Sequence, residues 1–503
     1  MQYLSYIYII VLCSILPLFM RSGYYELGEA KADCYLTVSL SFFAIFIAAM
    51  VIQLFRIRRL AAKAQNEGVR VPANRETSAE QPMFFPNFFL RGFLFSSLLS
   101  FIFSVDKKMA FFGFEGWRNG FLEALLAAFF LFVYSKYSYD KKWTVFTALA
   151  VPAFEFFLGI CDRMGLNFFA VEGRSSGYLA TIGNINWYAG FLSIFVPIGM
   201  GLVYCKKERD IIFYLSCIYT VLGLVALFVQ GSDGAILILA SSLILLLFIA
   251  LESRNYIRRL LRVLLLVGLS MTIVDAIMLF AKDFYNYDDN LLLMLCMRHI
   301  GIVILAAIFF LFCLTRLFDE IKVNFNTKRL RIAFSVVLGI LLLAGIAFFI
   351  SSFDDSFGNG RGIIWRMCYD LFIGLPDWQK MVGVGQDCLY SYVQGNEMWR
   401  VSFLNVFGDD ILTNTHCELL TVLIERGFIG AVCYLGLFIS VLSKLIKANK
   451  KESTAIVCAL PIFSYLIFNQ ISFAQVMSTP YVFVLMGFGM GLIENSNHGS
   501  SGI

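Results

Sequence analysis

Residues 184–209 read NINWYAGFLSIFVPIGMGLVYCKKER, a continuous apolar run over 184–204 that a basic cluster follows directly. A run of this length crosses the hydrocarbon core of a bilayer as one α-helix. The pattern recurs along the whole chain, which is 59% hydrophobic, only 15% charged and has a mean hydropathy of +0.77. Ordinary soluble domains carry about 25% charged residues. The composition therefore excludes a soluble globular protein and predicts a membrane protein.

Apolar runs of this kind predict an all-α polytopic membrane protein with about 14 (12–14) transmembrane helices. They lie at about 3–20, 35–55, 88–104, 118–134, 143–161, 184–204, 211–229, 234–251, 263–281, 291–314, 332–351, 428–446, 455–474 and 480–493. A closed barrel would need strands of alternating polarity, whereas these runs are continuous. The first run has no basic segment before it and no small-residue cleavage site after it, so we expect a retained helix rather than a signal peptide.

Basic residues alternate between successive loops, which predicts the orientation. Most of the 40 Lys and Arg residues lie in six loops that follow the even-numbered runs. These clusters are Arg56 to Arg75, Lys136 to Lys142, Lys206 to Arg209, Arg254 to Arg262, Arg316 to Arg331 and Lys444 to Lys451. Because such loops stay in the cytoplasm, both termini are predicted to be cytoplasmic, in a plasma or inner membrane.

The runs divide the chain into four parts. Residues 1–351 hold transmembrane helices 1–11, with a polar cytoplasmic linker at 56–86 that we expect to lack fixed structure. Residues 352–427 form a large extracytoplasmic loop, whose apolar residues recur at helical spacing and predict short amphipathic helices. Residues 428–493 hold transmembrane helices 12–14. Residues 494–503 are predicted to be a disordered cytoplasmic tail.

Four charged residues inside apolar runs lie in the predicted outer half of the membrane: Glu123, Glu155, Asp275 and Arg298. Arg91 is the exception, because it lies near the predicted cytoplasmic end of its run and can reach that surface. Charges at such depth are costly and usually face a cavity or a partner. We therefore infer a wet cavity that opens to the outside. The alternative is that each residue reaches outward to water or forms a structural pair.

Three motifs on the outer side carry the candidate chemistry. The first has Arg174 within residues 173–177, then Asn184 and Asn186 at the start of the 184–204 run. The second has Arg361 and Trp365, then Pro376 and the Gly383-Val384-Gly385 turn. The third has His416 and Glu418 within Thr415 to Leu420, then Glu425 within Ile424 to Gly430.

Together, over about residues 170–450, these motifs resemble the O-antigen ligase / O-antigen polymerase superfamily of polytopic membrane glycosyltransferases. The resemblance implies transfer of a glycan from a polyprenyl-diphosphate carrier to an acceptor hydroxyl on the outer face. It implies that Arg174 and Arg361 bind the diphosphate and that His416 lies near the reacting centre. The expected partners are the lipid-linked glycan donor, a glycan or lipid acceptor and membrane lipids. No nucleic acid, cofactor or metal is expected.

The chemistry of these side chains agrees with that role. A diphosphate leaving group gains negative charge, and arginine supplies permanently charged donors for it. An imidazole with a pKa near 6.5 accepts a hydroxyl proton at neutral pH.

One position departs from the family pattern. Where many members carry an arginine at the start of a middle span, residues 230–235 of this chain have Asp233. We hypothesise that Arg298 supplies the missing cation and that Asp233 orients an arginine or contacts a sugar hydroxyl.

Structural roles remain open beside the chemical ones. His416 could serve as a helix cap or a loop residue. Glu418 could be a first-turn acid favoured by the helix dipole, or it and Glu425, which share a helix face, could orient His416 or an arginine. Asn184 and Asn186 could fix the loop backbone, and Trp365 could pack at the membrane interface. Arg174 and Arg361 could contact lipid headgroups. Arg426 could make a headgroup contact or a structural one. At the level of the whole protein, the alternative is a flippase or transporter of a lipid-linked glycan.

Overall fold

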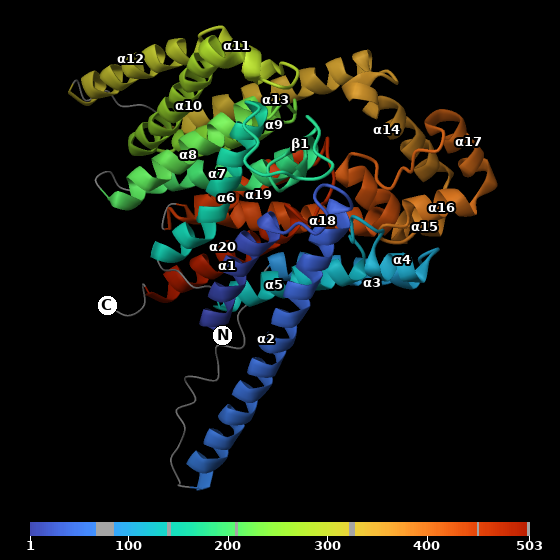
Figure 1. Cartoon of the computed structure of the whole chain (residues 1–503). Helices are drawn as coiled ribbons and strands as arrows, with labels where there is room; N and C mark the ends of the chain where they lie inside the picture. The colour runs from blue at the N-terminus through green and yellow to red at the C-terminus, as the bar shows by residue number, and fades with distance from the viewer. Residues whose placement is uncertain (67–84, 138–141, 207–209, 321–326, 450–451, 500–503) are drawn as a thin grey trace.

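The computed structural model describes residues 1–66, 85–137, 142–206, 210–320, 327–449 and 452–499. The described chain is almost entirely helical, with one two-stranded hairpin (Figure 1). The first half holds α1 (Gln2–Leu18), α2 (Leu27–Asn66), α3 (Phe85–Ile102), α4 (Lys107–Phe112), α5 (Phe121–Tyr137), α6 (Lys142–Arg163), β1 (Tyr178–Leu179), β2 (Gly183–Asn184), α7 (Ile185–Cys205), α8 (Ile211–Val229) and α9 (Ala235–Ala250). The second half holds α10 (Arg254–Ala281), η3 (Lys282–Phe284), α11 (Leu291–Met297), α12 (Ile300–Glu320), α13 (Thr327–Ser352), α14 (Phe357–Gly374), α15 (Asp377–Val382), α16 (Leu389–Gly395), α17 (Glu397–Phe407), α18 (Glu418–Ala448), α19 (Ala455–Phe468) and α20 (Thr479–Gly499).

Within the described residues, seven helices are long and apolar enough to cross a membrane. The number is eight if α11 and α12, which are bent by 72° at their junction, form one span. Four shorter apolar helices lie in α1, α3, α9 and α19. Thirteen of the fourteen predicted runs fall mainly on one helix each, whereas the run 291–314 is divided between α11 and α12. The chain is therefore an all-α, multi-pass membrane protein, and fourteen crossings remain a prediction.

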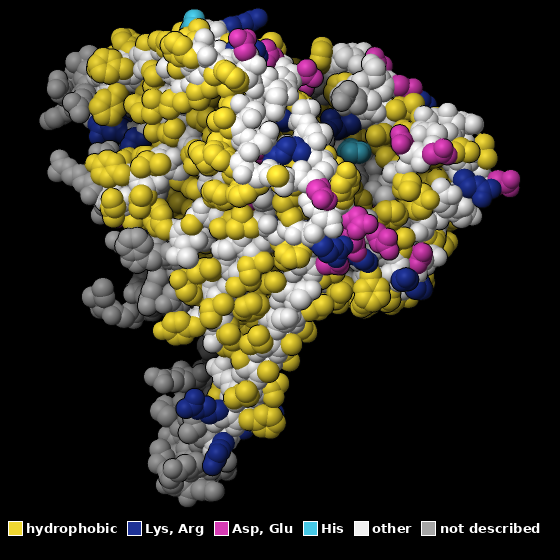
Figure 2. All heavy atoms as spheres, in the orientation of Figure 1, with side chains coloured by type: hydrophobic (Ala, Val, Ile, Leu, Met, Phe, Trp, Pro, Cys, Tyr) yellow, Lys and Arg dark blue, Asp and Glu magenta, His cyan; other side chains and the backbone are white. Residues whose placement is uncertain are grey.

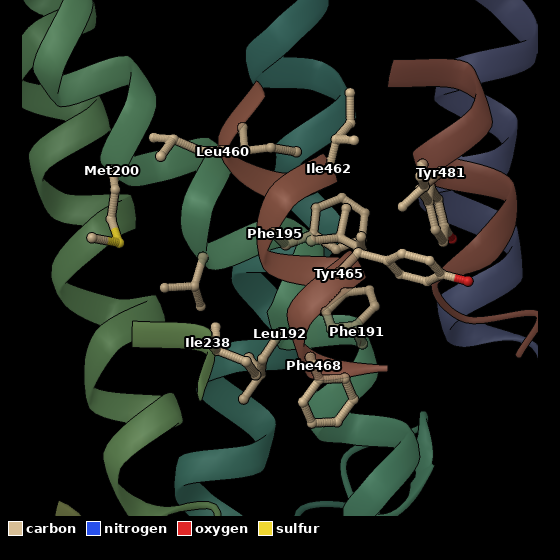
Figure 3. Packing of buried hydrophobic residues seen from close by; sticks show 14 of the residues in the cluster. Phe191, Leu192, Phe195, Met200, Ile238, Leu460, Ile462, Tyr465, Phe468 and Tyr481 are labelled. Carbon is tan, nitrogen blue, oxygen red and sulfur yellow. The ribbon is translucent and has the colours of Figure 1, made fainter. Parts of the chain in front are cut away.

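The helix that holds the opening stretch, α7, lies at the centre of the bundle. Every residue in the most apolar 18-residue stretch of α7 is buried, whereas none is buried in the corresponding stretch of α13. Figure 3 shows Phe191 and Phe195 of α7 packed among side chains of α19, including Leu460 and Tyr465. Because α7 is surrounded by protein, its N-terminal end, where the first motif lies, is held in a fixed position.

Two helices at the edge of the bundle have little protein around them. The apolar window of α2 is only 11% buried and that of α13 is not buried at all. In Figure 1, α2 extends away from the other helices. Between α2 and the helices α3, α5 and α20 lies a cavity of about 500 Å³ with largely apolar walls, including Phe43, Phe129 and Met490. Exposed apolar faces of this kind suit contact with lipid tails.

Two predicted disordered segments are partly helical. Residues 56–66 of the predicted linker continue α2, and residues 494–499 of the predicted tail continue α20. The expectation was wrong for 56–66 because a helix that has begun in an apolar run extends at little cost into residues with good helix propensity, here Arg, Leu, Ala, Lys and Gln. Residues 494–499 have poor helix propensity, and their helix is the continuation of a helix already begun in the apolar run. Residues 67–84 and 500–503 lie outside the described residues.

The predicted extracytoplasmic segment 352–427 contains four helices, α14 to α17. It has a small apolar core of its own, in which Cys368, Leu371 and Val384 pack with Ile424 of α18. Figure 2 shows hydrophobic side chains over the bundle, whereas acidic and basic side chains gather mainly on the side of the view that holds α4 and α14–α17. This polar end of the molecule holds most of the candidate residues.

Candidate functional site

A buried arginine that the sequence reasoning did not single out ties two of the candidate loops together. Arg163 ends α6 and is only 1% exposed. Its Nε and Nη2 donate to the carbonyl of Gln230 at 2.8 and 2.6 Å, and its Nη1 donates to the carbonyl of Ser176 at 2.5 Å. The loops that hold Arg174 and Asp233 are therefore connected through one guanidinium. The sequence offers one sign of this role. Arg163 is a basic residue at the predicted outer end of an apolar run, where the positive-inside rule makes basic residues uncommon.

Arg174 is engaged by its own loop. Its Nη1 donates to Asp162 at 2.7 Å and to Asn167 at 2.5 Å, and Nη2 donates to the carbonyl of Phe169 at 3.2 Å. Its Nε is buried and has no hydrogen-bond partner among the described residues. These contacts fix the guanidinium and leave its buried Nε–H without a partner.

Asn184 starts helix α7, while Asn186 lies in the first turn. The side-chain oxygen of Asn184 accepts hydrogen bonds from the backbone N–H groups of Asn186 and Trp187, both at 3.0 Å. This is the loop-fixing role, in which an asparagine side chain satisfies the free N–H groups of a helix start. The structure gives Asn186 no side-chain hydrogen bond within the described part of the chain.

Three candidate residues from different motifs form one electrostatic group. Arg361, in α14, lies close enough to His416 to lower the pKa of the imidazole, and Asp233 opposes the lowering of the Arg361 pKa by burial. The Nη1 of Arg361 donates to the carbonyl of Gly358 at 3.0 Å, while its Nε is buried without a partner among the described residues. A cation with a free donor therefore lies beside the histidine.

His416 is positioned by its backbone and by an aromatic neighbour. Its φ is +52°, and its N–H donates to the side chain of Asn414 at 3.1 Å. The imidazole meets the ring of Phe473 edge-on, with centroids 5.2 Å apart. His416 is not the helix cap, because α18 has Cys417 in that position.

The ring of His416 is available for proton transfer. Among the described residues, no hydrogen bond to either ring nitrogen is recorded. Burial, and then the nearby Arg361, lower the pKa of His416 to about 4. The imidazole is therefore neutral at pH 7 and has a free lone pair to accept a proton.

The two candidate glutamates share a small chamber beneath this group. Glu418 and Glu425 line a cavity of about 30 Å³ together with Glu123, Asp387 and Arg426. A space of this size holds about one water molecule. The carboxylates line this chamber with Arg426 and not with His416, and no ion pair between them and Arg426 is found among the described residues. Glu418 lies in the first turn of α18, as its structural alternative expects, and accepts the N–H of Ala474 at 2.5 Å.

Arg426 corrects one interpretation. Its side chain is 9% exposed and its guanidinium lies 4.8 Å from the ring centroid of Phe93, inside the protein. It is therefore not a headgroup contact, and the structural alternative stands. The helix α18 is interrupted at Gly427, directly after Arg426. This kink turns Arg426 inward, and the residue pattern alone does not show the kink.

The second and third motifs meet through their backbones. The N–H groups of Val384 and Gly385 donate to the carbonyls of Ile424 and Glu425 at 3.0 and 3.1 Å. These carbonyls are free because α18 is interrupted at Gly427, where φ is 67° and ψ is −174°. The Gly383-Val384-Gly385 turn was predicted as a turn, and its function in the fold is to complete this kink.

Asp387 is a chamber residue that the sequence reasoning missed. Its carboxylate accepts the backbone N–H groups of Phe114 and Asn119 at 2.8 and 2.9 Å. Burial raises its pKa to about 6, against the opposing effects of these bonds and of Arg426. One oxygen each of Glu123 and Glu425 lacks a partner among the described residues. The chamber therefore has unused acceptors.

Arg298 and Trp365 lie apart from the His416 group in their recorded contacts. Arg298 is exposed at the break between α11 and α12, and nothing in the described residues links it to Asp233 or His416. Its proposed cationic role stays a prediction. Trp365 packs in an aromatic cluster with Phe349, Phe353 and Phe357, which agrees with the packing alternative for this residue. Its indole Nε1 is buried without a recorded partner.

The four charges inside apolar runs do not share one cavity in the described chain. Only Glu123 faces the chamber. Glu155 accepts hydrogen bonds from the hydroxyl and N–H of Thr181 at 2.6 and 3.2 Å, and Asp275 contacts His299 at 2.5 Å. Structural pairing, the alternative considered, therefore accounts for Glu155 and Asp275.

No group of three or more His, Cys, Asp or Glu side chains in the described residues has an arrangement that could hold a metal ion. Comparison of the sequence with protein-family models and with curated proteins found no match to either.

Proposed function

We propose that this protein is a membrane glycosyltransferase. It transfers a glycan from a polyprenyl-diphosphate carrier to an acceptor hydroxyl on the outer face of the membrane, and so polymerises or ligates a cell-surface polysaccharide. The observation that carries the proposal is a buried His416, whose ring has no hydrogen-bond partner among the described residues, within electrostatic range of Arg361, whose buried Nε–H also lacks a partner there; the two residues come from separate motifs. One can accept a proton and the other can stabilise a phosphate oxygen, which are the two needs of this reaction.

The reaction would proceed as a displacement at the anomeric carbon. The acceptor oxygen forms the new bond to that carbon while its proton passes to a ring nitrogen of His416. The bond between the anomeric carbon and the diphosphate oxygen breaks, and its electron pair leaves with the diphosphate. The guanidinium of Arg361 faces this growing negative charge. A fixed, permanently charged donor stabilises such a transition state more than the ground state.

The low pKa of His416 has a consequence for the order of events. A base with a pKa of about 4 is neutral but weak. A bound diphosphate would offset the charge of Arg361 and raise the pKa of the imidazole toward its ordinary value. The histidine would therefore become a stronger base once the donor is in place, while burial would still keep its pKa below 6.5.

The test replaces His416 with alanine in cells whose own copy of the gene is deleted. Removal of a general base costs about 10²–10⁴-fold in rate, so surface glycan should fall by at least about 100-fold while the lipid-linked donor accumulates. His299→Ala is the matched control, because this exposed histidine pairs with Asp275 and lies outside the His416 group. Normal surface glycan from His416→Ala, at normal protein level, would contradict the proposal.

A further inference from the structure

A second hollow lies beside the His416 group and has no role in the proposed chemistry. Its volume is about 680 Å³, within the range of ligand sites. The start of α2, the loop 113–120 and the entrance to α7 form its walls. Neither His416 nor Arg361 lines it. We call it the α2 groove.

Aromatic rings form one part of the groove wall. Trp117 and Trp187 meet with ring centroids 5.4 Å apart, and Tyr24 and Tyr178 with centroids 4.6 Å apart. Trp187 fits closely against Gly28, where an added Cβ would lie 2.6 Å from the indole ring. Rings held this rigidly offer flat apolar faces at a low entropic cost.

Polar groups in fixed positions complete the wall. Glu29 accepts from the Gly116 N–H at 2.6 Å and forms an ion pair with Arg118, and Arg21 pairs with Asp33 at 3.1 Å. Among the described residues, no ion pair is recorded for Glu115, which is exposed. Its carboxylate can accept hydrogen bonds from a ligand.

The indole N–H of Trp187 gives a second, independent sign of a ligand. Trp187 is 7% exposed and lines the groove, and its Nε1 has no hydrogen-bond partner in the described part of the chain. A buried donor without a partner is costly, so native proteins rarely leave one unless another molecule satisfies it. The groove therefore combines flat apolar faces with unused donors and acceptors.

This combination selects the chemistry of the ligand. A sugar ring has an apolar C–H face that suits aromatic rings and a rim of hydroxyls that suits carboxylates and an indole N–H. An anionic ligand such as a diphosphate is disfavoured, because four carboxylates line the groove and the arginines Arg21 and Arg118 are already paired with three of them; the lining carboxylates are Glu26, Glu29, Asp33 and Glu115. The groove fits a neutral or amino-substituted saccharide.

The groove approaches the His416 group through a chain of rings. Trp117 lies with its centroid 4.8 Å from that of Phe473, and Phe473 in turn lies 5.2 Å from the His416 ring. We propose that the α2 groove binds the saccharide of the acceptor, with the sugar next to Trp117 nearest to His416. This inference rests on the proposed function for its catalytic meaning, whereas saccharide binding itself does not.

The experiment measures binding without turnover. The full-length chain that carries His416→Ala, purified in detergent, is titrated by calorimetry with oligosaccharides. The oligosaccharides are obtained by mild acid cleavage of the surface polysaccharide of the source cells. We expect saturable binding, and Glu115→Gln should raise the dissociation constant about tenfold, because a charge-assisted hydrogen bond is replaced by a weaker one. Trp117→Phe should raise it as well.

Matched controls keep the result specific. Glu397→Gln and Trp378→Phe change the same residue types at exposed positions outside the groove, and they should leave the dissociation constant unchanged. Absence of saturable binding, or equal effects of groove and control variants, would overturn the inference.

Failure of this inference can be told from failure of the proposed function. If His416→Ala abolishes transfer in cells but the groove variants bind normally, the inference fails and the function stands. If the groove variants weaken binding but His416→Ala cells make normal glycan, the assignment of His416 fails and the saccharide site stands.

Discussion

Arg163 illustrates how one buried side chain can position residues it does not touch. Its guanidinium satisfies carbonyls in two loops, and the ring of Tyr287 lies 4.1 Å from it. A buried arginine is stable only when its donors are used, so the loops and the arginine depend on each other. The positions of Arg174 and Asp233 follow from this dependence.

Replacement of Arg163 by methionine should destabilise the protein. The change leaves the carbonyls of Gln230 and Ser176 without their donors, at a cost of about 3 kcal/mol. Thermal unfolding in detergent should therefore begin at a lower temperature. Arg366→Met is the control, because Arg366 pairs with Asp355 at the exposed surface, where ion pairs add little to stability. Equal melting temperatures for Arg163→Met and the unaltered chain would contradict this interpretation.

The titration of His416 can be measured directly, because the chain has only three histidines. Burial and Arg361 disfavour the imidazolium, so NMR of the histidine-labelled protein should give His416 a pKa of about 4 rather than the ordinary 6.5. The folded protein binds this proton more weakly than the unfolded chain does. Its contribution to stability is therefore full above pH 6.5 and is lost as the pH falls through about 4.

Arg361→Gln tests the cause of this shift. Loss of the neighbouring cation should raise the pKa of His416, while burial should keep it below 6.5. A pKa that does not change in Arg361→Gln would mean that the two residues are not neighbours.

The interruption of α18 at Gly427 is the most consequential feature of any helix in the site. It separates a short first segment, with Glu418 and Glu425, from the membrane-crossing remainder. The hydroxyl of Ser100 donates to the carbonyl of Glu425 at 2.6 Å, so α3 also supports the break. Three elements therefore hold the chamber residues in place.

Gly427→Ala should prevent correct folding of this region. A Cβ would lie 2.3 Å from the carbonyl of Met381, and the positive φ disfavours any other residue. We expect markedly lower protein levels and a lower melting temperature in membrane extracts. Gly339→Ala in α13 is the matched control, because no atom lies within 4 Å of its added Cβ, and alanine favours a helix. Wild-type stability of Gly427→Ala would disprove the role of the kink.

The sequence predicted helices well and their interruptions poorly. The apolar runs are helical, because hydrocarbon permits no other single-segment structure, although the run 291–314 forms two helices instead of one. The kink at Gly427 is completed by the distant Gly383-Val384-Gly385 turn, and at the break between α11 and α12 His299 contacts Asp275, so periodicity does not reveal either interruption. The same holds for the site. Arg361 and His416 could be named from motifs, whereas Arg163 and Asp387 acquire their roles only through contacts made in the folded protein.

The two ends of the described chain lie on the same side of the bundle. The hydroxyl of Ser5, near the start of α1, donates to the carbonyl of Tyr137 at 2.5 Å. Glu494, near the end of α20, pairs with Lys136 at 3.1 Å. Both contacts are made at the end of α5, next to a basic loop. This arrangement agrees with an even number of crossings.

A fusion experiment tests the predicted orientation of the molecule. Because basic loops remain in the cytoplasm, alkaline phosphatase joined to the C-terminus should be inactive and green fluorescent protein joined there should fluoresce. Phosphatase fused after Leu375, in the segment predicted to be extracytoplasmic, should be active. The reverse pattern would place the His416 group on the cytoplasmic side.

Because α2 and α13 have few protein neighbours, their positions depend in part on the lipid that surrounds the protein. A water-soluble domain carries its own lateral support, whereas these helices expose apolar faces that suit acyl chains, and a largely apolar cavity of about 500 Å³ lies beside α2. A change of detergent or of bilayer thickness therefore acts on them as a substitution acts on a buried residue. Lipid composition is, for this chain, a structural variable equivalent to sequence.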